Sequence, residues 1–438
     1  MKKEGLAARY ENRDRLQHLI HDCIYARGGD VSARARTVEL GAVYLQLSEK
    51  GRETFHDILA HDFDIDRQVL AEKSRELEEA ESQEEAIKAE IALKNALAPP
   101  RISLLKQFSS LPNGLKLLID MRAALLARVR EDPRLYKLSL DIKDLLGAWF
   151  DIGMLDLQEI TWNSPAALLE KLIEYEAVHE IRSWDDLRHR LDSNRLCYAF
   201  FHNKMPAEPL IFVEVALVDR LSTDIEELLN RVEEKSDPDR ATTAVFYSIS
   251  NTQPGLAGIN LGNFLIKVVV QKLSSRFDNL KHFATLSPVP GFQGWLGPRL
   301  ARGDEEVLAP KERTVLQERF ACDNAAAHLA KILTGEWYKN IETAETVRPV
   351  LLRLCARYLL EEKRGEGALD PVANFHLTNG ARLERINWLA DLSEAGMERS
   401  YGIMVNYYYE LGAIEKNHEE YVSSGRIVAG RGVWSLLK

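Results

Sequence analysis

The chain has 438 residues, with 57 basic and 67 acidic side chains and a formal net charge of −10 at pH 7. This length predicts two or three domains, each able to bury a full hydrophobic core. The acidic balance disfavours a general nucleic-acid binder or membrane-surface binder, because either would need a basic face.

Cysteine usage and the absence of long apolar runs indicate the compartment. Cys23, Cys197, Cys322 and Cys355 are widely spaced and form no CxxC or Cys/His pair at metal-ligand spacing. They predict reduced thiols in a reducing compartment, not disulfides or a zinc site. No run is apolar over the roughly 18–20 residues of a membrane span. The first 17 residues mix charges of both signs without an apolar core, so we expect a cytoplasmic protein without a targeting segment.

The first third of the sequence has the periodicity of amphipathic helices. Apolar residues recur at spacings of three, four and seven over residues 70–91, and charged residues fill the positions between them. Pro99 and Pro100 predict the end of this helix, because proline cannot continue the backbone ladder. A second stripe covers residues 115–129. Short links between such helices predict an antiparallel helical bundle.

The pattern changes near residue 145 to that of an α/β domain with added helices. A helix is expected over residues 261–277, and further helices over residues 305–362. We expect the chain to divide into residues 1–147 and residues 148–438. β-Branched and aromatic runs bounded by turn formers predict strands over residues 197–201, 209–217, 242–250 and 282–287.

A glycine-rich loop over residues 250–263 follows the third strand and opens the helix after it. Gly255, Gly258 and Gly262 permit tight turns and a close approach of the backbone to a ligand. Free N–H groups at the helix start suit a pyrophosphate. The spacing is neither a P-loop nor a GxGxxG fingerprint. It resembles the Gln-x-x-Gly-x-Gly/Ala loop of the acetyltransferase (GNAT) superfamily, which holds the pyrophosphate of CoA. A turn that needs glycine only for packing is the alternative.

Two further residues could carry chemistry. Ser287 ends the fourth predicted strand, before a turn with two prolines and a glycine, and its hydroxyl could donate to a thioester oxygen. His376 precedes an Asn-Gly turn that we expect to lead into a helix, and histidine is the natural proton donor near neutral pH. Taken singly, a strand-terminating serine and a structural histidine are the alternatives.

Several longer motifs occur together and in order. They cover residues 160–166, 175–179, 201–217, 253–267, 286–292, 374–388 and 404–409. Their combination resembles the malonyl-CoA decarboxylase family in detail over residues 145–410, whereas the helical first third resembles that family in architecture only. The resemblance implies an α+β protein of two domains, an N-terminal antiparallel helical bundle and a C-terminal mixed α/β domain of the GNAT type with added helices.

The resemblance also implies an activity. A member of this family decarboxylates malonyl-CoA to acetyl-CoA and CO₂ through a thioester enolate that is protonated at carbon 2, in malonate or fatty-acid metabolism. It needs no cofactor and no metal, because the CoA thioester is itself the substrate. The expected partners are malonyl-CoA and further copies of the chain, in a homodimer or homotetramer formed through the N-terminal helices. No nucleic acid or membrane is expected.

Residue by residue, the resemblance places the catalytic roles on Ser287, His376 and Tyr409. Ser287 and backbone N–H groups near Gly258 are expected to donate to the enolate oxygen. His376 is expected to protonate carbon 2. Family members carry glutamate where this chain has Asn260, and asparagine can hold a hydrogen bond but cannot exchange a proton. The segment expected to bind malonyl-CoA consists of Ala257, Gly258, Ile259, Asn260, Leu261, Gly262 and Asn263.

Two alternatives have the same fold. A CoA-dependent acyltransferase would use the same strand, loop and helix with a second substrate as acceptor. A non-enzymatic protein would join a helical interaction module to an inactive CoA-binding domain, although Ser287, His376 and Tyr409 argue against it.

Overall fold

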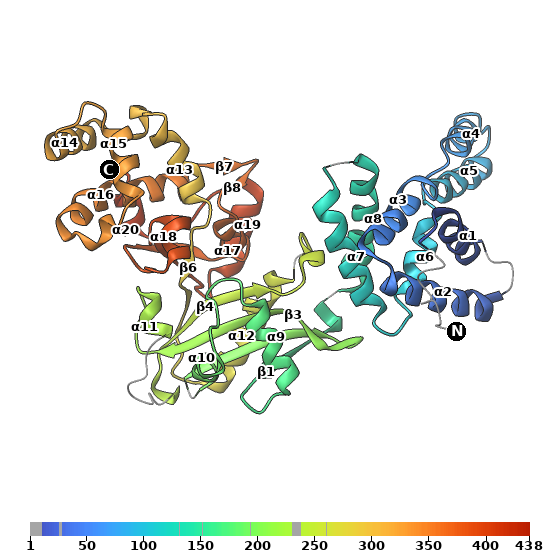
Figure 1. The fold of residues 1–438 in the computed structure, drawn as a ribbon, viewed down its shortest axis with the longest axis horizontal. Coiled ribbons are helices and arrows are strands. Elements are labelled where there is room, and N and C mark those ends of the chain that lie inside the picture. The colour runs from blue at the N-terminus through green and yellow to red at the C-terminus, as the bar shows by residue number, and fades with distance from the viewer. Residues whose placement is uncertain are drawn as a thin grey trace. The chain divides into compact units, whose positions relative to one another are not determined.

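The structure, a computed structural model, describes residues 11–25, 29–130, 132–150, 152–192, 194–229, 238–259 and 261–438. The chain divides into two compact units, which Figure 1 colours in chain order. The helical unit comprises Met1–Asp156, Phe201–Leu210 and Thr252–Leu261, and the sheet unit comprises Leu157–Phe200, Ile211–Asn251 and Gly262–Lys438. The expected boundary after residue 147 stays a prediction.

The helical unit contains α1 to α8 in its described part. Polar caps begin several of these helices. Asp132, for example, accepts from the backbone N–H of Arg134, and Pro133 occupies the first turn of α8, where it loses no hydrogen bond. The bounds are α1 Arg13–Ile24, α2 Gly29–Gln46, α3 Glu49–His61, α4 Arg67–Glu78, α5 Gln83–Ala96, α6 Arg101–Phe108, α7 Gly114–Arg128 and α8 Pro133–Trp149.

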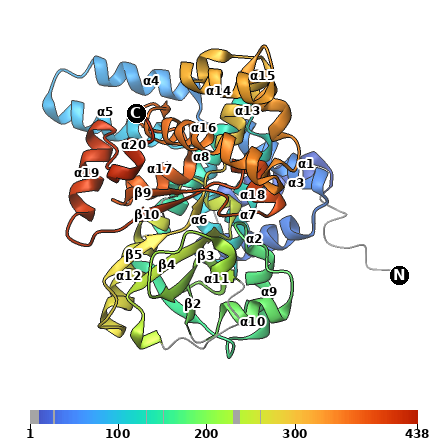
Figure 2. The same cartoon turned by 90° about the vertical axis from the view of Figure 1, so that its left-hand side faces the viewer.

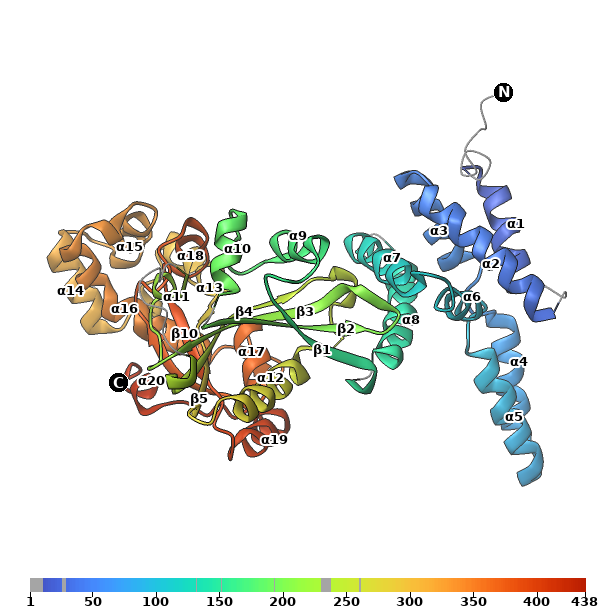
Figure 3. The same cartoon turned by 90° about the horizontal axis from the view of Figure 1, so that it is seen from below.

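The single helix predicted over residues 70–91 is wrong, because two helices occupy this region. α4 ends at Glu78 and α5 begins at Gln83. The hydroxyl of Ser82 accepts from the N–H of Glu85 and caps the start of α5. Figures 1 and 3 show the two helices side by side. The apolar spacing continues across the turn, so periodicity alone did not reveal the break.

The sheet unit is organised around an eight-stranded mixed sheet in its described part. Its order is β1-β2-β3-β4-β5-β10-β6, and β9 pairs with β10. Figure 2 shows β2 to β5 with α12 beside them. The bounds are β1 Leu155–Ile160, β2 Arg195–His202, β3 Met205–Val218, β4 Thr243–Asn251, β5 His282–Thr285, β6 Ser287–Pro288, β9 Arg382–Asn387 and β10 Met404–Tyr408, with a separate hairpin of β7 Lys363–Arg364 and β8 Gly367–Ala368.

Helices surround this sheet, as the sequence predicts. α12 covers the stretch expected to be helical after the glycine-rich loop and connects two parallel strands, β4 and β5. The predicted fold class, a helical N-terminal part and a mixed α/β part with added helices, is confirmed. The helices are α9 Ala166–Tyr175, α10 Trp184–Arg190, α11 Ile225–Leu229, α12 Gly262–Arg276, α13 Phe292–Ala301, α14 Pro310–Phe320, α15 Ala325–Leu333, α16 Ile341–Leu360, α17 Pro371–Thr378, α18 Glu394–Ser400, α19 Ile414–Ser424 and α20 Arg431–Ser435.

Strands β4 and β5 separate halfway along β4. They pair in parallel from Thr243 with His282 to Phe246 with Thr285. The N–H of Leu286 still donates to the carbonyl of Phe246, but β4 then continues to Asn251 without β5. β6 pairs instead with β10. The two strands therefore leave an opening beyond their last paired residues.

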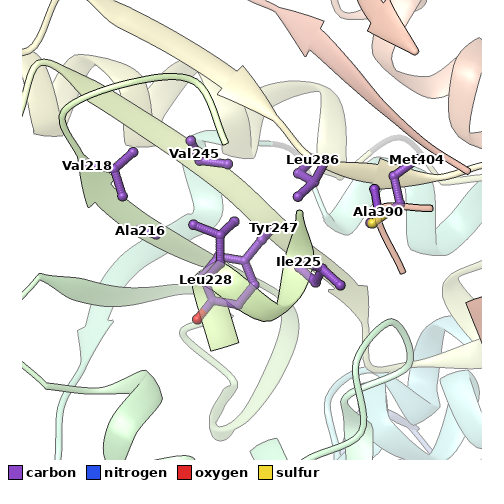
Figure 4. Close-up of a cluster of buried hydrophobic side chains, with 9 residues drawn as sticks. All are labelled: Ala216, Val218, Ile225, Leu228, Val245, Tyr247, Leu286, Ala390 and Met404. Carbon is purple, nitrogen blue, oxygen red and sulfur yellow. The ribbon is translucent and has the colours of Figure 1, made fainter. Parts of the chain in front are cut away.

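A buried apolar cluster supports the base of this opening. Figure 4 shows that it joins residues from β3, β4, α11 and β10 with residues between elements. Burial of large apolar side chains contributes roughly 1.5–3 kcal/mol each to folding. The cluster consists of Ala216, Val218, Ile225, Leu228, Val245, Tyr247, Leu286, Ala390 and Met404.

Within the described residues, every helix is too short or too polar to span a bilayer.

Gly255 provides a test of packing within the helical unit. A Cβ at this position would lie 1.9 Å from the carbonyl oxygen of Ile119 on α7. Gly255→Ala should therefore lower the free energy of unfolding by about 2 kcal/mol, the usual cost of overpacking. Gly147→Ala is the matched control, because Gly147 lies in α8 with nothing within 4 Å of the added Cβ. This control should be neutral or stabilising by about 0.5–1 kcal/mol. Urea unfolding followed by circular dichroism measures both, and equal stability of the two variants would contradict the predicted contact.

Candidate active site

Three predicted residues meet inside the sheet unit. The Ser287 hydroxyl lies 3.1 Å from Nε2 of His376, and Nδ1 of the same ring lies 2.8 Å from the hydroxyl of Tyr409. All three side chains are buried. Ser287 begins β6, His376 lies on α17, and Tyr409 directly follows β10. The fold thus joins residues that are 89 and 33 positions apart into one chain of hydrogen bonds.

The expectation that Ser287 ends the strand beginning at residue 282 is wrong. β5 ends at Thr285, and Ser287 starts β6, where it pairs with Val405 of β10. The change of strand partner explains the break: Leu286 still donates to β4, whereas Ser287 already belongs to the pairing with β10. The serine is therefore held from β10 at the point where β4 and β5 separate.

A buried polar network fixes the Ser287 side of the site. The Ser287 hydroxyl donates to Oγ1 of Thr285 at 2.8 Å, and this oxygen also accepts from the backbone N–H of Tyr407. Asn406 donates from Nδ2 to the carbonyls of Thr285 and Ser222 at 2.8 and 3.0 Å. Buried and satisfied networks of this kind hold side chains in one arrangement.

His376 lies inside a helix, not before one. α17 begins after Asp370, whose carboxylate accepts from the N–H groups of Val372 and Ala373. The Asn379-Gly380 turn follows α17, but it leads into strand β9 and not into the expected helix. Gly380 has φ +80°, and a Cβ there would lie 2.1 Å from the carbonyl of Ile414, so the glycine serves the turn and its packing.

Asp370 links the two sides of the site. Besides capping α17, it accepts from the N–H of Gly291 at 3.2 Å, in the turn that follows Ser287. Tyr358 donates a further hydrogen bond to it. Burial raises the pKa of Asp370, and the backbone N–H donors act in the opposite direction. One fully buried carboxylate thereby ties the turn after Ser287 to the start of the helix that carries His376.

Burial keeps His376 neutral. Its ring stacks on Tyr407, with centroids 4.6 Å apart and an interplanar angle of 25°, and meets Phe375 edge-on. Desolvation in these aromatic surroundings lowers the pKa of His376 to about 3. Burial also raises the pKa of Tyr409 well above its usual value. Near neutral pH, both groups therefore keep their uncharged forms and act as hydrogen-bond partners.

A cavity of about 320 Å³ opens onto Ser287 and His376. The part of β4 that extends beyond β5 forms one wall, and the start of α17 forms another. The lining is largely apolar and consists of Val178, Phe246, Tyr247, Ser248, Ile249, Asn251, Ser287, Pro288, Pro371, Val372, Phe375 and His376.

The glycine-rich loop is held from within the helical unit. Arg122 of α7 is buried and donates to the carbonyls of Gly255 and Ala257. Gly258 has φ +76°, a conformation that favours glycine. The N–H groups of Ala257 and Ile259 donate within the loop, whereas that of Gly258 has no partner among the described residues. Gly258 is therefore positioned to offer an N–H group to a ligand.

The predicted binding segment is only partly described. Ala257 and Gly258 are exposed, Ile259 is half-buried, and Leu261 is buried. Gly262 and Asn263 begin α12. Asn260, where the family resemblance would place a glutamate, lies outside the described residues. Within the described ranges, no group of three or more His, Cys, Asp or Glu side chains could hold a metal ion.

Comparisons with known proteins match nearly the whole chain. The family model "Malonyl-CoA decarboxylase C-terminal domain" matches residues 153–438, and the model "Malonyl-CoA decarboxylase N-terminal domain" matches residues 63–150. The chain belongs to the malonyl-CoA decarboxylase family. The predicted family and enzyme class are thus confirmed.

Curated relatives and solved structures agree with this membership. The mitochondrial malonyl-CoA decarboxylase of Anser anser anser is 38% identical over 422 residues, which cover 92% of this chain and 84% of that protein. The mitochondrial enzyme of Rattus norvegicus is 39% identical over 86% of this chain and 80% of its own length. The crystal structure of malonyl-CoA decarboxylase from Rhodopseudomonas palustris is 41% identical, with a TM-score of 0.87 over 97% of this chain and 99% of that one. The structure from Agrobacterium vitis is 38% identical with the same TM-score, over 97% of this chain and 100% of that one.

Sequence reasoning missed four residues that position the candidate site or the glycine-rich loop. Asp370 and Arg122 tie segments together, whereas Thr285 and Asn406 hold Ser287 and β10. Asp370 had a signal, because Asp-Pro is a typical start of a helix. Asn406 stood within a recognised motif. Arg122 had no signal, because its partners lie 133 and 135 residues away.

The neutral state of His376 predicts a pH effect on stability. Below pH 6.5 an unfolded histidine binds a proton, whereas folded His376 with a pKa of about 3 does not. Stability linked to this residue is therefore complete above pH 6.5 and falls as the pH drops towards 3. Between pH 7 and pH 5, the wild type should lose about 2 kcal/mol more unfolding free energy than His376→Asn. Urea titrations at both pH values measure this difference, and parallel losses in the two proteins would show that His376 titrates normally.

Arg122 provides a test of the loop. If the loop binds CoA, Arg122→Ala should raise the dissociation constant of free CoA about tenfold, because two carbonyls lose a charged donor. Arg128→Ala is the control, because Arg128 lies on the same helix but donates to Asp57. Calorimetric titration with CoA measures both variants. If both variants lose stability and neither changes its affinity for CoA, the role of Arg122 is purely structural.

Proposed function

We propose that Ser287, His376 and Tyr409 carry out the decarboxylation of malonyl-CoA to acetyl-CoA and CO₂ in this chain. One observation carries the assignment: a continuous chain of hydrogen bonds, 3.1 and 2.8 Å long, joins the three side chains, and two of them line the cavity. The hydrogen bonds satisfy these buried polar groups, and the opening of the cavity onto Ser287 and His376 gives a substrate access to two of them.

The directions of these hydrogen bonds follow from the donors available. Ser287 donates to Thr285, so we assign the Nε2–H of His376 as the donor to the Ser287 oxygen. Nδ1 then accepts from the hydroxyl of Tyr409. This tautomer points a proton towards the cavity and leaves the Ser287 hydroxyl free to turn from Thr285 to a substrate.

The first step breaks the bond between carbon 2 and the carboxylate carbon. CO₂ leaves, and the electron pair moves onto the thioester oxygen as an enolate. A donor aimed at that oxygen lowers the barrier, and in other enzymes one such donor contributes roughly 10²–10³ in rate. The Ser287 hydroxyl fills this role. The apolar lining of the cavity favours the step further, because it replaces water around the leaving carboxylate.

The second step protonates carbon 2. His376 gives its Nε2 proton to carbon 2 while Nδ1 takes the hydroxyl proton of Tyr409, so the imidazole stays neutral throughout. The negative charge that the malonyl carboxylate brought in then rests on Tyr409 until Nδ1 returns its proton to Tyr409 and Nε2 takes a proton from water, which restores the starting tautomer. Because burial raises the pKa of Tyr409, this anion regains its proton readily.

The free edge of β4 supports binding of the CoA arm. Beyond Phe246, no described strand pairs with β4 on the side of β5, and Ser248, Ile249 and Asn251 line the cavity. An unpaired strand edge offers N–H and C=O groups to an extended amide chain. The amide groups of a CoA thioester fit this chemistry, with Ala257–Asn263 as the proposed binding segment for the phosphates.

We further propose that the reaction needs neither metal nor organic cofactor, and that it serves malonate or fatty-acid metabolism. A homodimer or homotetramer through the helical unit is supported by exposed apolar side chains on or next to α4 and α5, among them Val69, Ile87 and Ile91. The four free cysteines support a reducing compartment, such as the cytoplasm. The net charge of −10 supports the absence of nucleic-acid partners.

The experiment that tests this function is mass spectrometry of the purified protein incubated with malonyl-CoA alone. The wild type should produce acetyl-CoA, and in D₂O the methyl group should gain one deuterium. Ser287→Ala and His376→Asn should each reduce kcat by about 10²–10⁴, because each removes one chemical role. Tyr409→Phe should also reduce kcat by about 10²–10⁴, because it removes the proton donor to Nδ1 of His376 and the group that holds the negative charge.

Tyr408→Phe is the matched control for Tyr409→Phe. Tyr408 is the neighbouring residue, but its hydroxyl contacts His282 and not His376. The Tyr408→Phe variant should turn over malonyl-CoA with the kcat of the wild type. Failure of the folded wild type to release CO₂ would overturn the proposed function. Acyl transfer to an added amine without loss of CO₂ would instead establish the acyltransferase alternative.

A further inference from the structure

The segment of residues 176–180 follows α9 in the connection to α10 and is neither helix nor strand. Side-chain hydrogen bonds nevertheless hold it at both ends, so we call it the anchored loop. It also contributes Val178 to the wall of the catalytic cavity. A wall residue on a rigid but irregular segment can define the shape of a site without taking part in the chemistry.

Glu176 makes the first anchor. Its carboxylate accepts from the backbone N–H groups of Val178 and His179 at 2.8 and 2.9 Å. The same carboxylate accepts from the hydroxyls of Ser248 and Ser250 on β4, at 2.8 and 3.2 Å. The backbone on either side of the Val178 side chain is therefore fixed to the strand that forms the cavity wall.

Arg190 makes the second anchor. Its side chain is 3% exposed and donates to the carbonyls of His179 and Glu180 at 2.8 and 3.0 Å. It also pairs with the buried carboxylate of Glu214 on β3 at 3.2 Å and with Asp186 on α10. Truncation of the Val178 side chain would leave both anchors in place, because each of them holds the backbone.

Val178 separates two cavities of the sheet unit. On one side lies the catalytic cavity with Ser287 and His376. On the other side lies a cavity of about 450 Å³, and Val178 lines both. Removal of the two methyl groups of Val178 would therefore enlarge the catalytic cavity towards the second cavity. Removal of a side chain from the core would instead leave an enclosed hole. Other apolar residues of the second cavity include Ile225 and Leu229, which belong to or pack against the cluster in Figure 4.

Other apolar walls of the catalytic cavity are backed by solid protein. Phe246 is 1% exposed and contacts the ring of Tyr409. Phe375 contacts the ring of His376. A smaller residue at either position would disturb the catalytic hydrogen bonds as well as the volume. Val178 has no aromatic ring and no polar side-chain atom, so its substitution removes no ring contact and no side-chain hydrogen bond from the catalytic residues.

We propose that Val178 is the residue that limits the size of the substituent on carbon 2 of the acyl group. This inference rests on the proposed function. A malonyl group carries only hydrogen at carbon 2, whereas a 2-alkylmalonyl thioester carries an added methyl or larger group. In an apolar pocket that the smaller substrate fills, one added carbon changes the ratio of kcat/KM between two substrates about 10- to 200-fold. The anchored loop keeps Val178 from moving aside, and so the wall excludes the branched substrate.

The branched reaction follows the same steps and balances in the same way. In methylmalonyl-CoA, the bond between carbon 2 and the carboxylate carbon breaks, CO₂ leaves, and carbon 2 takes one proton to give propionyl-CoA. Ser287 and His376 keep their roles. A variant that admits the methyl group should therefore gain this activity without a new catalytic residue.

The experiment compares kcat/KM for malonyl-CoA and methylmalonyl-CoA, with acetyl-CoA and propionyl-CoA measured by mass spectrometry. Val178→Ala should raise the ratio for methylmalonyl-CoA over malonyl-CoA at least tenfold, because the added methyl enters the vacated space. Val178→Thr should keep the ratio of the wild type, because threonine has nearly the shape of valine. Val178→Ile should lower the ratio.

Leu229→Ala serves as the control for the second cavity, since Leu229 lines that cavity and not the catalytic one. In Leu229→Ala, the ratio of kcat/KM for methylmalonyl-CoA over malonyl-CoA should equal that of the wild type. An unchanged ratio in Val178→Ala, with normal turnover of malonyl-CoA, would overturn the role of Val178 and leave the proposed function intact. An equal rise in Leu229→Ala would also overturn it. A wild type inactive on both substrates would refute the proposed function instead.

Discussion

The separation of β4 from β5 beyond Phe246 and Thr285 is the constraint on which the site depends. Hydrogen bonding between parallel strands would otherwise fill this part of the sheet with backbone. Because Ser287 pairs with β10 instead, its hydroxyl lies at the edge of an opening. The same change of partner exposes the edge of β4 to the cavity. The proposed catalytic hydroxyl and the proposed surface for the CoA arm thus arise from one irregularity of the sheet.

Neutral polar groups suit this opening better than charges. A charged histidine at this depth would need a partner, and among the described residues the His376 ring is hydrogen-bonded only to the hydroxyls of Ser287 and Tyr409. The aromatic rings of Tyr407 and Phe375 therefore select the neutral imidazole, and in the proposed mechanism this ring passes on a proton without carrying a net charge. The negative charge in the reaction comes from the substrate, so the cavity can remain apolar until the substrate enters.

The sequence was informative where a signal is local. We could predict the strand-like runs, the helix after the glycine-rich loop and the helical first third. Their signals, apolar periodicity and turn-forming residues, lie within a few neighbouring positions of the sequence. Ser287, His376 and Tyr409 could be proposed from the sequence because each stands in a recognisable motif, and the structure brings the three side chains together. Arg122, Thr285 and Val178 were not, because their importance comes from partners that only the fold brings near. The break between α4 and α5 was missed because the apolar spacing continues across it.

The residues that the sequence missed are mostly those that hold other residues in place. Asp370 fixes the turn after Ser287 to the helix of His376, and Glu176 fixes the anchored loop to β4. Both are carboxylates that accept backbone N–H groups from one segment and a further donor from another. A carboxylate can do this because its two oxygens offer several acceptor positions. An irregular segment fixed in this way can be as rigid as a helix, so the walls of the cavity need not come only from regular elements. On the proposed roles, a substitution at Val178 changes selectivity and leaves the hydrogen bonds among Ser287, His376 and Tyr409 in place.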